Sequence, residues 1–217
     1  MRLLLIDTCG EVGSVALSEG ETIAASETLP ERGSSSALLP AVTRLLKAKG
    51  WALSKLDGIG VVAGPGSFTG VRVGLAAAKG LCEAAGLPLA AVSRLAVLAE
   101  TAGLVEGYAV LDAGRGEYYV RVMRPGEDAQ DVLCRRDDLL VKAEATRVVV
   151  AEAKLVEGLG ALRPELHLLS VEQALPVVLR GLREGGSDVA TTDANYVRGE
   201  SDIYAKVGAP GLAAGLN

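Results

Sequence analysis

Gly64-Pro65-Gly66-Ser67-Phe68-Thr69-Gly70-Val71-Arg72-Val73-Gly74 is the run of sequence that decides the fold. Residues 56–63 before it form a short apolar segment, and residues 71–85 after it are typical of a helix rich in small residues. Glycine permits positive φ and close approach of another backbone, and the free N–H groups of a helix's first turn can face an anion. The run therefore predicts a strand-to-helix loop that either binds an anion or serves only to pack the turn.

Six residues of this run are candidates for a nucleotide or anion loop, because they combine flexible backbone, hydroxyl groups and one guanidinium. The guanidinium has three roles open to it: contact with a nucleotide phosphate, contact with a carboxylate, or capping of a neighbouring loop. The Walker pattern Gly-x-x-x-x-Gly-Lys-Ser/Thr is absent, because Gly70 is followed by Val71 and Arg72 and not by a lysine and a hydroxyl residue. The candidates are Gly64, Gly66, Ser67, Thr69, Gly70 and Arg72.

The composition is that of a globular protein. Of its 217 residues 49% are hydrophobic, enough for one large domain or two closely packed lobes. No apolar stretch approaches the roughly 18 residues that a membrane span needs. The apolar run at residues 1–7 is too short for a secretory signal and is typical of a first strand. We therefore expect a cytoplasmic protein without a membrane partner.

Charge and cysteine content exclude further classes. The formal net charge is −5, so the bare chain is a poor tRNA binder, and any RNA contact would need a partner. Cys9, Cys82 and Cys134 are odd in number and widely separated, which argues against a disulfide framework and a structural zinc site. We expect them to be small core or boundary residues.

The first half of the chain predicts a three-stranded meander over residues 2–7, 13–18 and 22–28, followed by a helix over residues 37–49. Ser36 is the expected N-cap of this helix, which leaves Pro40 in the first turn. A broad apolar stripe runs along the helix. It consists of Leu38, Leu39, Val42, Leu45 and Leu46.

The second half repeats this plan. Residues 108–111 lead to Asp112, a glycine turn and a second apolar strand at 117–123, just as residues 3–6 lead to Asp7 and the next strand. The two aspartates are 105 residues apart, so they align when the second half of the sequence is laid over the first. The pattern predicts two duplicated lobes; the alternative is that any α/β chain offers two such hairpins.

The rest of the second half is less regular. Strands are expected at 130–134 and 147–151, and helices at 137–141, 152–159 and 171–184, before Gly185-Gly186-Ser187 ends the packed region. We therefore predict an N-terminal lobe over residues 1–103 and a smaller C-terminal lobe over 104–190. Residues 191–217 form a Gly/Ala-rich tail that either docks on a partner or frays.

Three segments resemble the bacterial TsaB (YeaZ) family. They are the Gly64–Gly74 run, residues 3–17 with Leu3-Leu4-Leu5-Ile6-Asp7-Thr8, and residues 110–119, in which Gly114 stands where an arginine is more usual. The resemblance covers residues 1 to about 125, and Asn195-Tyr196-Val197-Arg198 is weakly similar to the family's carboxyl-terminal segment. It implies an α/β fold of two duplicated actin/Hsp70-like (ASKHA, RNase H-like) lobes, each a mixed sheet with flanking helices.

The same resemblance implies a function. The family supplies a non-catalytic scaffold that pairs with a TsaD-like catalytic subunit and enables threonylcarbamoyl transfer to adenosine 37 of tRNA. It also implies a TsaE-like ATPase that engages the pair, with tRNA reached only through the complex. A homodimer of the free chain and an ATP or ADP at the partner interface are both left open, and no cofactor of its own is implied.

Catalytic groups are scarce. The related TsaD carries a His-x-x-x-His metal pair on the corresponding helix, whereas Arg94 and Leu98 stand there in this chain, and His167 is its single histidine. We expect no metal site and no catalytic residue, which argues against a zinc peptidase. In the superfamily the two aspartates help to hold metal and phosphates. Asp7 and Asp112 are thus either structural and vestigial or, in the alternative function, part of an actin-like small-molecule kinase or ATPase with the glycine loop.

The remaining feature is a surface on the helices of residues 36–49 and 70–85. One offers the leucine stripe and the other a line of small residues that lets a second helix approach closely. The alternative is that these faces pack on the chain's own sheet. The candidate partner interface consists of Leu38, Val42, Leu45, Leu46, Val71, Gly74 and Ala78.

Overall fold

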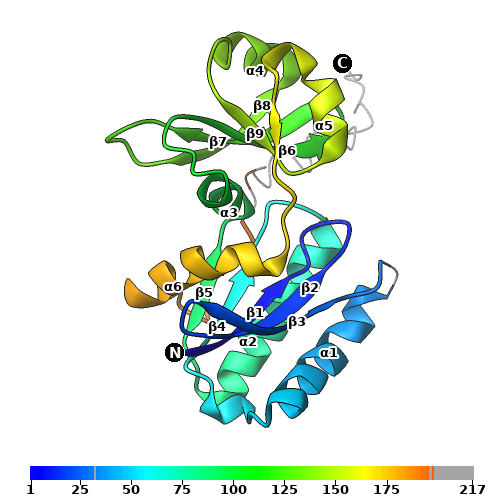
Figure 1. The fold of residues 1–217 in the computed structure, drawn as a ribbon, viewed down its shortest axis with the longest axis vertical. Coiled ribbons are helices and arrows are strands. Elements are labelled where there is room, and N and C mark those ends of the chain that lie inside the picture. The colour runs from blue at the N-terminus through cyan, green and yellow to red at the C-terminus, as the bar shows by residue number, and fades with distance from the viewer. Residues whose placement is uncertain (32, 196, 198–217) are drawn as a thin grey trace, which may run out of the picture.

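Two lobes, each built on a five-stranded sheet, make up the described part of the chain (Figure 1). The computed structural model describes residues 1–31, 33–195 and 197. The predicted two-lobed α/β fold is confirmed, and both termini of the described chain belong to the first lobe.

The first sheet has the strand order β3-β2-β1-β4-β5. Its first three strands form the predicted antiparallel meander, with Gly20 in the left-handed region (φ 64°) at the tight turn between the second and third. The last two strands run parallel to the first. The strands are β1 (Arg2–Asp7), β2 (Ser14–Glu19), β3 (Thr22–Thr28), β4 (Gly58–Val62) and β5 (Leu89–Val92).

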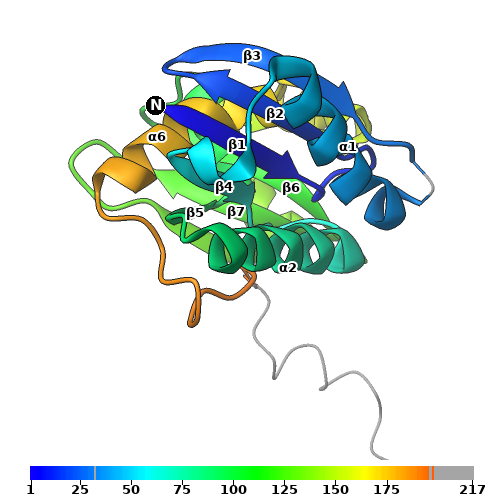
Figure 2. The same ribbon diagram turned by 90° about the horizontal axis from the view of Figure 1, so that it is seen from below.

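Helices cover both faces of this sheet. Side chains alternate between the faces of a strand, so Leu5 and Ile6 point opposite ways. Leu5 lies on the side of α6 (Leu175–Arg183), and Ile6 on the side of α2 (Phe68–Ala85). The helix α1 (Ser34–Lys49) packs beside α2, so two helices cover one face and α6 the other (Figure 2).

The second sheet repeats the first. Its order is β8-β7-β6-β9-β10, which is the order of the first sheet with five added to every number. Asp7 ends β1 and Asp112 lies in β6, so the predicted equivalence of residues 3–18 and 108–123 is confirmed. The strands are β6 (Gly107–Gly114), β7 (Glu117–Met123), β8 (Gln130–Arg135), β9 (Val148–Val150) and β10 (Glu165–Leu166).

The two lobes exchange their last helices. The helix α3 (Arg94–Thr101) follows β5 of the first sheet, yet it lies against the second lobe (Figure 1). Its Leu95 and Leu98 pack against Leu111 and Val149 of the second sheet. Helix α6 follows β10 and packs on the first sheet. A boundary at residue 103 therefore does not match the hydrophobic cores, which place α3 with the second lobe and residues 171–183 with the first.

Two further helices of the described chain lie where helices are expected: α4 (Arg136–Lys142) and α5 (Ala153–Gly158). Short 3₁₀ turns occur at Leu53–Lys55, Gly160–Leu162 and Val171–Ala174, of which the last alone falls within a predicted helix. None of the helices in the described part of the chain is long and apolar enough to cross a membrane.

The start of α1 differs from the prediction. The helix begins at Ser34 after Gly33, whose left-handed backbone (φ 80°) sets the entry, and Ser36 lies inside the first turn with its hydroxyl donating to the Gly33 carbonyl. Pro40 consequently sits in the second turn, where it is exposed. Gly33, with its left-handed backbone, is therefore the N-cap residue of α1, where a side-chain cap by Ser36 is expected.

The packed region continues beyond Gly185-Gly186-Ser187. Ser187 forms an antiparallel bridge with Leu89 at the sheet edge, Lys79 donates to the carbonyls of residues 190 and 192, and the Asn195 N–H donates to Ala63 at 2.8 Å. The predicted tail thus begins as a segment bound along the first lobe. Residues 196 and 198–217, which carry the rest of that prediction, lie outside the described residues.

Candidate functional site

The two aspartate turns have the same local geometry. In the first lobe Asp7 Oδ1 accepts the N–H of Cys9 at 2.8 Å, and in the second Asp112 Oδ1 accepts the N–H of Gly114 at 2.8 Å. Such a bond to the backbone two residues ahead is the turn that a short acidic side chain favours. Both carboxylates therefore act in fixing the turn after the first strand of their lobe.

The carboxyl group of Asp7 is buried. Burial raises its pKa above the ordinary 3.8, and the nearby positive charge of Arg94 and the Cys9 N–H only partly oppose this. The following Thr8 is buried too, and burial likewise raises the pKa of the Cys9 thiol. Asp7 is thus poorly placed to hold a solvated metal ion.

The carboxyl group of Asp112 has the opposite environment. Burial alone would raise its pKa, but the ammonium of Lys154, 2.5 Å from Oδ2, and the Gly114 N–H outweigh it, so the pKa lies below 3.8. Asp112 therefore remains ionised and is already paired with a cation of its own chain.

The glycine run forms the predicted loop between β4 and α2. Gly64 has a left-handed backbone (φ 98°), its bond to Pro65 is cis, and Ser67 caps the helix by accepting the Gly70 N–H at 3.3 Å. The Ser67 N–H donates to the Cys9 carbonyl at 2.9 Å. The loop is therefore bonded directly to the first aspartate turn.

Three glycines of this run, spaced four residues apart, lie against that turn. A Cβ atom at Gly66 would come within 2.4 Å of the Cys9 carbonyl oxygen, one at Gly70 within 2.0 Å of the Thr8 carbonyl oxygen, and one at Gly74 within 2.3 Å of Thr8 Oγ1. Thr8 Oγ1 donates to the Gly70 carbonyl at 2.6 Å. Close backbone approach thus explains the glycines, which is one of the two predicted uses of the loop.

The other residues of the loop point elsewhere. Arg72 is exposed, and its guanidinium stacks on the Phe68 ring, 3.7 Å from the centroid. Thr69 is also exposed. Only Gly66 and Ser67 among the six candidates line the space between the lobes, so anion binding by this loop stays a prediction.

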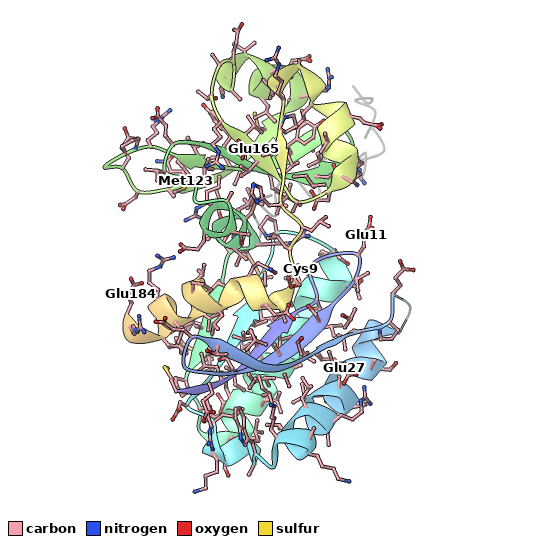
Figure 3. All side chains as sticks on the ribbon, in the orientation of Figure 1. Cys9, Glu11, Glu27, Met123, Glu165 and Glu184 are labelled. Atoms are coloured by element: carbon pink, nitrogen blue, oxygen red, sulfur yellow. The ribbon has the colours of Figure 1, made fainter. Side chains whose placement is uncertain are left out.

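A cavity of about 780 Å³ lies between the lobes. Figure 3 shows Cys9 and Glu11 on the turn after β1, on the side of the first lobe that faces the second. Two cations of the cavity wall are already paired with two of its carboxylates: Arg94 with Glu152, and Lys154 with Asp112. The lining residues are Cys9, Gly10, Glu11, Val12, Gly66, Ser67, Arg94, Asp112, Ala151, Glu152, Ala153, Lys154, Leu168 and Leu169.

The predicted partner interface needs correction. All but one of its seven residues are buried in the first lobe's own core, because their side of the two helices packs on the sheet; Leu46 is half-buried. Gly74 in particular faces Thr8 of the same lobe. The buried residues are Leu38, Val42, Leu45, Val71, Gly74 and Ala78. The solvent side of these helices instead carries Leu39 and Phe68, which are 51% and 53% exposed.

Sequence reasoning missed the residues that join the lobes. Glu152 is brought to Arg94 from the far end of β9, and Asp131 is brought to Ser93 from β8. These pairs are separated by 58 and 38 residues, so no local spacing marks them. The one signal in the sequence is Arg94 itself, the single charged residue between Val92 and Ala99.

Metal-ligating groups are sparse. Among the described residues no three His, Cys, Asp or Glu side chains are grouped so that they could hold a metal ion. His167 lies 3.6 Å from Glu165 at the second lobe's surface and far from both aspartate turns in sequence.

Known proteins share this architecture. A crystal structure from Pseudomonas aeruginosa, described as an uncharacterized protein with similarity to peptidase YEAZ, is 30% identical, with a TM-score of 0.76 over 91% of this chain and 99% of that one. YeaZ from the same organism is also 30% identical, with a TM-score of 0.70 over 88% and 96% of the two chains.

Curated relatives agree over part of their length. The tRNA threonylcarbamoyladenosine biosynthesis protein TsaB of Escherichia coli is 40% identical over 123 residues, covering 55% of this chain and 53% of that protein. The protein of the same name in Bacillus subtilis is 37% identical over 122 residues, with the same coverage. The matched part spans about half the length of these relatives.

The paired sheets, the exchanged helices and the two aspartate turns define a two-lobed protein of the actin-like class. The family model described as TsaD, tRNA N6-adenosine threonylcarbamoyltransferase, matches residues 24–154, more than half of the chain. The chain belongs to this family, in its TsaB (YeaZ) branch.

Proposed function

We propose that this chain is a non-catalytic subunit of the machinery that makes threonylcarbamoyladenosine in tRNA, and that it pairs with a TsaD-like catalytic subunit. The observation that carries the proposal is the 40% identity, over 123 residues, to a protein named for this biosynthesis.

The chemistry of the chain supports a subunit without activity of its own. A single histidine cannot supply the two-histidine metal site expected of a TsaD-like enzyme. Two of the carboxylates that line the interlobe cavity, Asp112 and Glu152, are paired with Lys154 and Arg94. Catalytic groups would then come from the partner.

The exposed side of α1 and α2 is the proposed contact with that partner. Leu39 and Phe68 are large apolar side chains exposed there, and Arg72 extends the patch by stacking on Phe68. Ala76 is exposed, and a Cβ at Gly80 would meet no atom within 4 Å, so a second helix has room to approach. This replaces the buried face with the opposite face of the same helices.

The proposal includes further partners. A TsaE-like ATPase engages the pair, and ATP or ADP binds at the interface rather than in the chain alone. The net charge of −5 favours contact with tRNA only through the complex. The free chain uses the same apolar face to form a homodimer, and the protein acts in the cytoplasm.

Reconstitution tests the function. The purified chain, a TsaD-like subunit and the remaining components are incubated with tRNA, and threonylcarbamoyladenosine is measured by mass spectrometry. We expect product only when all components are present and none from this chain alone. Modification at the full rate without this chain would refute the proposal.

Interface variants test the contact. Leu39→Glu and Ala76→Glu place charge in the patch and are expected to weaken binding to the TsaD-like subunit by about tenfold or more, the scale of a loss of about 1.4 kcal/mol or greater at an interface. Val141→Glu is the matched control, because Val141 is likewise an exposed apolar residue, on α4 of the other lobe. Equal affinity of all three variants would place the contact elsewhere.

The alternative of an actin-like kinase or ATPase has no comparable support. It needs Asp7 and Asp112 to face a metal and phosphates, whereas Asp7 is buried and Asp112 is bonded to Lys154. Tight ATP binding by the isolated chain would revive it, and isothermal titration of ATP with Mg²⁺ is the direct measurement.

A further inference from the structure

We propose that Ser93 and Arg94, where the chain crosses from β5 to α3, form a fixed joint that holds the two lobes in one relative orientation. Each of these neighbouring residues bonds to a carboxylate of the second lobe. The protein would then present its surfaces as one rigid body rather than opening and closing around a ligand.

Arg94 connects the lobes through both its backbone and its side chain. Its N–H donates to the Gly64 carbonyl of the first lobe at 2.7 Å, and its Nη1 donates to Glu152 Oε1 of the second at 3.1 Å. Nη2 lies 3.3 Å from the position of a Cβ at Gly10, so the guanidinium rests on the first aspartate turn. The side chains of Arg94 and Glu152 are only 11% and 18% exposed.

Ser93 makes the second attachment. Its hydroxyl donates to Asp131 Oδ2 on β8 at 2.7 Å, and the same carboxylate accepts Arg121 Nη1 at 2.7 Å and Asn195 Nδ2 at 3.3 Å. The Asn195 N–H is itself bonded to Ala63 of the first lobe. Asp131 therefore binds the crossing and the carboxyl-terminal segment of the first lobe at once.

Two attachments with different partners restrict the lobes more than one would. One attachment would still let the lobes rotate about it. Ser93 bonded to Asp131 on β8 and Arg94 bonded to Glu152 after β9 together remove that rotation. A shielded ion pair contributes little net stability but is costly to break, because one charge stays buried. Arg94 Nε also has no hydrogen-bond partner among the described residues, a further cost of keeping the guanidinium here.

The other charges around Arg94 support the same position. The carboxylate of Asp7 attracts it from the first lobe, as that of Glu152 does from the second. The guanidinium thus lies between acidic groups of both lobes. Loss of its charge would leave Asp7 and Glu152 without this shared cation.

Distance measurements between spin labels test the joint. Ala48→Cys on α1 and Val141→Cys on α4 place labels at exposed sites of the two lobes, in a Cys134→Ser background that leaves only the buried Cys9 and Cys82. We expect one narrow distance distribution for this parent. Arg94→Gln and Glu152→Gln should each broaden it or add a second maximum.

Arg147→Gln is the matched control, since it breaks an exposed ion pair with Glu165 inside the second lobe and should leave the distribution narrow. Circular dichroism checks that each variant is folded; if Arg94→Gln is not, Glu152→Gln decides, because it keeps the shape of the side chain. A broad distribution in the parent, or an unchanged narrow one in the folded variant, overturns the proposal. The measurement needs no partner, so it is independent of the proposed function.

Discussion

The aspartate turns of the two lobes have one backbone geometry and opposite electrostatics. Each carboxylate accepts the N–H two residues ahead at 2.8 Å, and each turn joins the first two strands of a sheet with the same strand order. Yet burial raises the pKa of Asp7, while Lys154 brings the pKa of Asp112 below its ordinary value despite partial burial.

The difference comes from the helix that follows the fourth strand of each sheet. In the first lobe this is α2, 18 residues long; its Gly70 and Gly74 lie against Thr8, and Gly66 in the loop before it lies against Cys9. In the second lobe it is α5, six residues long, which provides Lys154 instead of a glycine face. Shared topology therefore does not imply a shared chemical role, and the predictions below test each side of this contrast.

The largest effect is expected from Gly70→Ala. The new methyl group would lie 2.0 Å from the Thr8 carbonyl oxygen, a backbone atom that cannot move without disturbing the turn. Because overpacking at such a contact forces the backbone apart, we expect a loss of about 3 kcal/mol in the free energy of unfolding. Urea denaturation followed by circular dichroism measures it.

Gly80→Ala is the control on the same helix. A Cβ there would meet nothing within 4 Å, so alanine's better helix propensity should raise stability by up to about 1 kcal/mol. Equal effects of the two substitutions would show that the helix does not press on the first turn, and the explanation for the burial of Asp7 would fail.

Asp7→Asn should stabilise the protein at neutral pH, because burial penalises the ionised carboxylate and so raises the pKa of Asp7. The amide oxygen can still accept the Cys9 N–H, while the buried charge disappears. Asp7→Ala is the control: it removes the acceptor as well, leaves that N–H without its bond, and should destabilise.

The pH dependence of Asp7→Asn follows from the raised pKa. Asp7 contributes most to stability below pH 3.8, where it is protonated in both states, and this contribution is lost as pH rises through its higher folded pKa. The advantage of asparagine should therefore grow with pH in thermal melts. An advantage that instead shrinks with rising pH would mean that the folded protein prefers the charged carboxylate.

These two sites also show how far the sequence predicts the molecule. A strand that ends in an aspartate, followed by a turn and a second strand, was enough to predict both lobes and the equivalence of Asp7 and Asp112. Such a pattern can be read from the sequence because side-chain alternation and turn chemistry depend on neighbouring residues. It did not reveal that α3 and α6 exchange lobes, because the choice of sheet depends on which apolar surfaces meet in space. The predicted boundary at residue 103 follows the order of the chain, whereas the hydrophobic cores do not.

The candidate site was predictable only in part. The glycine loop was placed correctly, but the apolar stripe on α1 was assigned to a partner although Leu38, Val42 and Leu45 pack on the lobe's own sheet. An amphipathic pattern tells which side of a helix is apolar and not what covers it. The pairing of Arg94 with Glu152 joins residues 58 positions apart, beyond the reach of any local pattern.

Gly114→Ala tests the second turn for a different cause of strain. Gly114 has a φ of 73°, but a Cβ there would meet nothing within 4 Å. The expected loss is about 1 kcal/mol and arises from the left-handed backbone rather than from a clash. An alanine that costs as much as it does at Gly70 would contradict the open surroundings of the second turn, and a urea titration of both variants makes the comparison.

Lys154→Gln should have the smallest effect. Lys154 is largely exposed, so the loss of its ion pair with Asp112 is screened by water and should cost less than about 1 kcal/mol. Because the lysine lowers the Asp112 pKa, its contribution is present above pH 3.8 and is lost as pH falls through the folded pKa. The variant and parent should thus differ in stability at neutral pH and converge in acid.

Titration of the Asp112 carboxyl carbon by NMR should show its pKa rising in the variant. An unchanged pKa would mean that the Gly114 N–H alone stabilises the carboxylate, and the contrast between the two turns would then rest on burial and not on the cation that α5 supplies.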